Sequence, residues 1–150
     1  MNEEKRQDPT VEFLSELYKN MKMGSDSIIN VSSKVKDGLL RDELMRELDT
    51  YEKYAKRIGK LIYESGNTPK EDNIMAKLGA KMGMAMNTLT DSTESHIAQM
   101  MIEGATMGIT ENMKLVSKYE DKGISEEALK LGRDTVKYME ETVENLKKFL

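Results

Sequence analysis

The residues of this chain whose types and spacing suit chemistry are one histidine and two acids. His96 is the only histidine, and Glu103 follows two turns later along the same edge of a predicted helix. Glu47 flanks the apolar stripe of another predicted helix, beside Leu44 and Leu48, so it is the acid best placed to turn inward. Imidazole and carboxylate ligands suit iron or manganese. One interpretation is therefore a metal or proton-transfer site made of His96, Glu103 and Glu47.

The other interpretation of His96 and Glu103 is a solvated helix edge. The apolar arc of their helix centres near Ile97 and Met101, and a row of polar residues lies roughly opposite to it. That row consists of His96, Gln99, Glu103, Thr110 and Lys114. We favour the polar edge over the metal site, because the pattern places these side chains away from a core.

The elements that position Glu47 are two predicted helices in the first half of the chain. The first begins after a cap at Asp8 or Thr10, runs to about Lys36 and stops at Gly38. Its apolar stripe is Leu14, Leu17, Met21, Gly24, Ile28, Val31 and Val35. The second ends at Gly66, and its stripe is Leu40, Leu44, Leu48, Tyr51, Ala55, Ile58 and Ile62. The short connection predicts an antiparallel hairpin.

The second half of the chain predicts a short helix and two long ones. A continuous helix from Lys70 would be about twice as long as its neighbours, so we place a break near residues 87–92. The short helix then covers about 71–86. A long helix runs from about Asp91 to Tyr119, capped by Thr90 or Asp91, and Gly123 closes it. Ser125 caps the last helix, whose predicted stripe is Leu129, Gly132, Val136, Met139, Val143, Leu146 and Leu150.

These elements predict an all-α fold, an antiparallel four-helix bundle with an extra short helix between the second and third long helices. A chain of 150 residues is long enough for one domain with a real core. We expect a flexible N-terminal segment, residues 1–9, followed by a single helical-bundle domain, residues 10–150.

Composition narrows the classes of function. The chain has no cysteine, which excludes disulfides and thiolate metal sites. Its net charge is −4, its charges are interspersed and it has no tryptophan, so nothing predicts nucleic-acid or anionic-membrane binding. The charged N-terminus and the lack of an apolar run of about 20 residues predict a soluble, cytoplasmic protein.

The bundle pattern, together with the segments 92–98 (STESHIA) and 103–108 (EGATMG), resembles the ferritin-like superfamily, in particular its small, uncharacterised, bacterial rubrerythrin-like members. The resemblance implies a carboxylate-bridged di-iron centre. Such a centre takes one Glu from each of two helices and a Glu-x-x-His pair from each of the other two. Here the single His96 is preceded at that spacing by Thr93. The resemblance therefore implies a degenerate or absent centre, with an atypical iron or manganese site as the alternative.

The stretch from Ala76 to Thr110 has a feature that points to association. Two segments, 79–83 (GAKMG) and 104–108 (GATMG), each place glycines four apart on one helix face, which allows close approach of another helix. Most of the 13 methionines also lie around this stretch, and methionine suits adaptable interfaces. The predicted interface residues are Gly79, Met82, Gly83, Met101, Gly104, Ala105 and Gly108. We expect no catalysis and no cofactor, and a protein that works through self-association, as a dimer, or through a protein partner. The alternative is a metal-binding oxidoreductase or storage protein.

Overall fold

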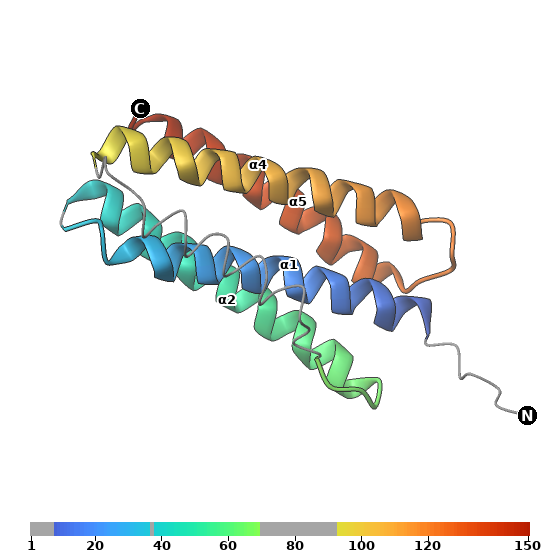
Figure 1. The fold of residues 1–150 in the computed structure, drawn as a ribbon. Coiled ribbons are helices and arrows are strands. Elements are labelled where there is room, and N and C mark those ends of the chain that lie inside the picture. Colours follow the sequence, from blue (N-terminus) through green and yellow to red (C-terminus); the bar gives the residue numbers. More distant parts are fainter. Residues whose placement is uncertain (1–7, 37, 70–92) are drawn as a thin grey trace, which may run out of the picture.

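The computed structural model describes residues 8–36, 38–69 and 93–150, and in these ranges the chain is helical without strands. The helices are α1 (Pro9–Ser32), α2 (Leu39–Glu64), α4 (Glu94–Tyr119) and α5 (Glu126–Lys147). They pack lengthwise against one another (Figure 1), which confirms the all-α prediction. The short helix predicted over 71–86, with Gly79, Met82 and Gly83, lies outside the described residues. Among the helices that are described, none has the length and apolar character required to cross a membrane.

Side chains cap the starts of α1, α4 and α5, whereas α2 begins after Gly38 without such a cap. The Asp8 carboxylate accepts a hydrogen bond from Thr10 N at 2.9 Å, and the Ser125 hydroxyl accepts from Ala128 N at 3.2 Å, so both of these predicted caps are confirmed. The predicted cap of α4, Thr90 or Asp91, was wrong by two or three residues. The cap is Thr93, whose hydroxyl accepts from His96 N at 3.3 Å.

The turn between α1 and α2 differs from the prediction. Helix α1 ends at Ser32 instead of near Lys36. The guanidinium of Arg41 donates to the carbonyls of Ser32 and Val35, at 3.1 and 2.8 Å, and thereby satisfies acceptors that the helix end leaves open. Gly38 does not stop α1. It precedes α2 with a φ of 93°, a conformation that glycine adopts without strain.

The bundle consists of two helix pairs, α1 with α2 and α4 with α5 (Figure 1). In the first pair Tyr18 lies beside Gly59, and the Tyr51 ring comes within 2.6 Å of the point where Gly24 would carry a Cβ. In the second pair the sulfur of Met139 lies 3.0 Å from the corresponding point at Gly108. On α4 and α5 Val116 also lies against Gly132, at 3.0 Å from the point where that glycine would carry a Cβ. Helix α1 then packs on α4, and α2 packs on α5.

The core follows the predicted stripes on α1 and departs from them on α2 and α5. On α2 Leu48 is half-buried, and Glu47 is buried in its place. Leu150 lies beyond the end of α5 and is exposed. On α5 itself Thr135 and Thr142 are buried, and three residues of the predicted stripe are half-buried. These three are Leu129, Val136 and Val143. Helix α5 therefore turns a different face to the core than the one predicted. Threonines can occupy this face because a buried hydroxyl can bond to its own helix, as the Thr135 hydroxyl does to the Gly132 carbonyl at 2.7 Å.

Candidate functional site

His96 and Glu103 lie on an edge of α4 and not in the core. His96 is half-buried in the first turn of the helix, and Glu103 is exposed. The Glu103 carboxylate accepts a hydrogen bond from the Gln99 amide at 3.3 Å. This is the arrangement of the polar-edge interpretation.

Glu47 has the opposite environment, since it is only 2% exposed. It turns inward, as the sequence indicated. The structure does not join it to the other two predicted ligands, because the described residues contain no group of three or more His, Asp and Glu side chains placed to hold a metal ion. His96, Glu103 and Glu47 therefore do not fit an iron or manganese ion as a set.

The carboxyl group of Glu47 has neither oxygen in a hydrogen bond with any described residue. Burial raises its pKa to about 9, followed by repulsion from Glu43 and the nearness of the Glu43 carboxyl, which favours a shared proton although the two groups do not meet hydrogen-bond geometry. Arg46 opposes this change, but its guanidinium binds Glu43 instead, at 2.7 Å. At neutral pH the Glu47 carboxyl thus keeps its proton. A neutral acid in an apolar core is the state that burial favours.

Tyr138 of α5 contacts the backbone of Glu47 and the tyrosines of α2. The Tyr138 hydroxyl donates to the backbone carbonyl of Glu47 at 3.5 Å. Its ring lies edge-on to Tyr51, with centroids 5.5 Å apart, and 5.7 Å from the ring centroid of Tyr54. Burial raises the pKa of Tyr138 to about 12 and also raises that of Tyr51. We call Glu43, Glu47, Tyr51 and Tyr138 the acid–tyrosine cluster. At neutral pH Glu47, Tyr51 and Tyr138 are uncharged, and Glu43 is paired with Arg46. This arrangement suits packing better than acid–base chemistry.

A second buried polar group lies around Asn112, which is fully buried on α4. Its amide oxygen accepts from the Asn20 amide of α1 at 2.8 Å. Its amide nitrogen donates to the Thr135 hydroxyl of α5 at 3.1 Å and contacts the Met21 sulfur at 3.8 Å. One side chain therefore ties three helices together. Its satisfied hydrogen bonds are those of a structural group.

Asn112 was not predicted from the sequence, although its position in the apolar repeat of α4 could have indicated it. The sequence of inward positions on α4 alternates steps of three and four: Ala98, Met101, Ala105, Gly108, Asn112, Leu115 and Tyr119. Asn112 occupies a place at which an apolar residue is expected. Glu47 occupies such a place between Leu44 and Tyr51. A polar residue at a core position of the repeat is the signal that would find both groups.

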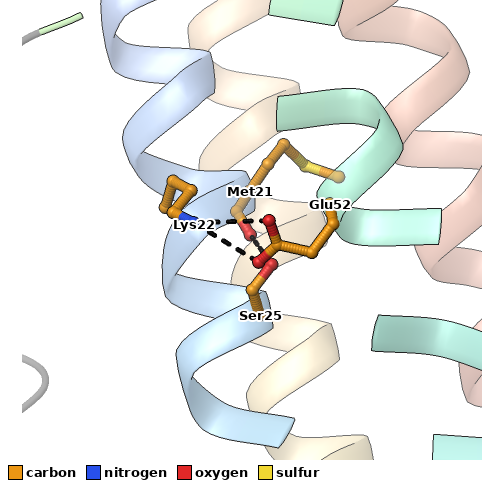
Figure 2. Close-up of polar contacts among 4 residues, drawn as sticks. All are labelled: Met21, Lys22, Ser25 and Glu52. Atoms are coloured by element: carbon orange, nitrogen blue, oxygen red, sulfur yellow. Dashed lines mark hydrogen bonds and ion pairs between the residues drawn. The ribbon is translucent and has the colours of Figure 1, made fainter. Parts of the chain in front are cut away.

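A groove of about 380 Å³ runs along the outside of the α1–α2 pair. It is lined by Tyr18, Lys22, Asp49, Glu52, Lys53, Ala55, Lys56, Gly59 and Pro69. Figure 2 shows Lys22 of α1 reaching Glu52 of α2, at 3.3 and 3.4 Å, next to the Ser25 hydroxyl that bonds back to the Met21 carbonyl. Burial alone would lower the pKa of Lys22, but the hydrogen bond and attraction of Glu52 raise it. The Lys22–Glu52 pair joins α1 to α2, and Lys53 pairs with Asp49 within α2.

The predicted interface residues of α4 separate into two groups. Met101 and Ala105 are buried in the bundle, and Gly108 packs against Met139, so these three serve the fold of the chain itself. Gly104 differs, because no described atom lies within 4 Å of the point where its Cβ would be. Met107, one turn further, is 67% exposed. Of the predicted interface residues on α4, Gly104 alone thus faces open space, and Met107, which was not predicted, is exposed beside it.

Comparison of the chain with protein-family models, with curated proteins and with solved structures found no significant match.

Proposed function

We propose that this protein is a non-catalytic, ferritin-like antiparallel bundle that works by self-association through the face of α4 around Gly104. In each helix pair, later residues of one helix contact earlier residues of the other, which supports the antiparallel arrangement. The lack of a convergent set of acids and histidine in the described chain favours a binding role over di-iron chemistry. The observation that carries the proposal is the open space beside Gly104.

Glycine inside a helix costs about 1 kcal/mol relative to alanine. At Gly108 close packing against Met139 offsets that cost. At Gly104 the described residues supply no such contact, although the residue lies well inside a helix of 26 residues. A helix of a second copy crossing at Gly104 would supply it, with the exposed and flexible Met107 packing beside the crossing. A two-fold axis there brings the same residues of both copies together.

Substitution of Gly104 tests the association surface. We expect the wild-type chain to form dimers and Gly104→Leu to be monomeric, since a leucine side chain occupies the space that the partner helix requires. The monomer should remain folded, because that space is open within the described chain. Multi-angle light scattering over a range of concentrations measures the mass, and circular dichroism measures the fold.

Cysteine cross-linking supplies an independent measurement, because the chain has no cysteine of its own. Met107→Cys should form a disulfide-linked dimer under mild oxidation. The matched control is Lys137→Cys on the exposed face of α5, which should stay monomeric. A wild-type chain that is monomeric at high concentration, or equal cross-linking of the two variants, would overturn the proposal.

The iron or manganese alternative draws on the unpartnered carboxyl of Glu47. Iron and manganese sites require several hard ligands, and no third His or acid converges with Glu43 and Glu47 in the described ranges. We therefore expect protein purified anaerobically with both metals supplied to contain no stoichiometric metal. Elemental analysis of the wild type, Glu47→Gln and His96→Ala checks this. Stoichiometric metal that is lost in either variant would establish the alternative.

A further inference from the structure

The two helix pairs meet along a seam that contains polar contacts at several levels. On the side of α1 and α4, the Glu12 carboxylate accepts from the Tyr119 hydroxyl at 3.1 Å, and Asn20 bonds Asn112. On the side of α2 and α5, the Tyr138 hydroxyl bonds the Glu47 carbonyl. Replacing apolar packing with polar contacts makes an interface more sensitive to water, because water competes for the same groups. The seam is therefore the plane along which this bundle separates most readily.

The α2–α5 side is the weaker half of this seam. Helices α2 and α5 pack less extensively than α1 and α4 do, and far less than the helices within each pair. The acid–tyrosine cluster fills this half. It contains the unpartnered Glu47 carboxyl, whereas the buried polar atoms of Asn112 on the other half are satisfied. A new charge on Glu47 therefore arises in the less extensively packed half of the seam.

The charged and titratable groups that act on the Glu47 carboxyl are few. Glu43 and Arg46 belong to its own helix, and Arg46 is engaged with Glu43. Tyr51 on α2 and Tyr138 on α5 are the titratable groups beside it. Within the described chain α1 and α4 contribute no charge to this set. When Glu47 loses its proton, the cation that acts on it is Arg46, which is already paired with Glu43. Water must therefore enter to compensate the new charge.

We infer that the α2–α5 seam is a proton-linked gate: ionisation of Glu47 separates α2 from α5, while the α1–α2 and α4–α5 pairs each stay together. Protonation closes the gate, and rising pH opens it. The open form exposes Tyr138 and Thr142 of α5, which are otherwise half-buried and buried. The gate concerns contacts between α2 and α5, whereas the proposed association concerns Gly104 on α4, so the two are tested by separate variants.

Thiol labelling of Thr142→Cys tests the gate, again in a chain without other cysteines. The labelling rate with a neutral maleimide is measured from pH 6 to pH 9 and divided by the rate of the same variant in urea, which removes the effect of thiol ionisation. The normalised rate should rise by about tenfold per pH unit while Glu47 ionises. Adding Glu47→Gln should make it independent of pH.

Ala55→Cys is the matched control, since Ala55 is 2% exposed and lies against the α1–α2 groove. Its normalised labelling should stay flat. Equal pH dependence in Thr142→Cys with and without Glu47→Gln would overturn the gate. An equal rise at Ala55→Cys would also overturn it, because that result means global unfolding. If Thr142→Cys does not fold, amide hydrogen exchange of the wild type and Glu47→Gln decides the same question: faster exchange at pH 9 confined to α2 and α5 of the wild type supports the gate, and identical exchange refutes it.

Discussion

Glu47→Gln should raise the free energy of unfolding at pH 7 by about 3 kcal/mol. The native pKa of Glu47 is raised to about 9, mainly by burial, and the unfolded carboxyl titrates near 4.5. Between these values the unfolded state gives up a proton that the native state retains. The wild type therefore loses stability as pH rises through this window, and its full stability is present only below the unfolded pKa. Glutamine has nearly the same shape and does not titrate.

Urea denaturation of the wild type and Glu47→Gln from pH 4 to pH 8.5 measures this difference. The two chains should be about equally stable at pH 4 and should diverge steadily above pH 5. Glu140→Gln is the matched control, because Glu140 is exposed on α5, and its stability should follow that of the wild type. Parallel curves for wild type and Glu47→Gln would mean that the buried carboxyl has a partner at neutral pH.

The order and lengths of the described helices were largely predictable from sequence, because caps and apolar spacing are local properties. Asp8, Ser125 and Gly123 mark helix boundaries through groups within a few residues of themselves. The end of α1 was not predictable in this way. It depends on Arg41, which reaches back from the next helix to two carbonyls.

The candidate site was less predictable, because the side of a helix that faces the core depends on the helices packed against it. Glu47 was recognised as the best inward acid, but its grouping with His96 and Glu103 required an α4 orientation that the structure does not have. Tyr138 becomes part of the cluster only because α5 is rotated toward α2 by the burial of its threonines. That rotation follows from complementary surfaces on all the helices, and the hydrophobic pattern of α5 alone indicates a different face.

Asn112→Ala is expected to lower the free energy of unfolding by about 3 kcal/mol. The substitution removes side-chain volume from a fully buried position and leaves a cavity. It also removes the acceptor of Asn20 and the donor to Thr135, so contacts of α4 with both α1 and α5 are lost together. Equilibrium urea denaturation at a fixed pH measures the loss.

Two further variants separate packing from hydrogen bonding at this position. Asn145→Ala, at a half-buried site on α5, controls for the loss of an asparagine and should change stability by less than about 1 kcal/mol. Asn112→Leu keeps the number and branching of the side-chain heavy atoms, and Thr135 retains its bond to the Gly132 carbonyl, so this variant should recover most of the loss. If leucine is as destabilising as alanine, the hydrogen bonds of Asn112 stabilise the bundle more than its packing does. If Asn112→Ala lowers the free energy of unfolding no more than Asn145→Ala does, the contacts of Asn112 with α1 and α5 contribute nothing to stability. Solvent or a local rearrangement then replaces every contact of the amide.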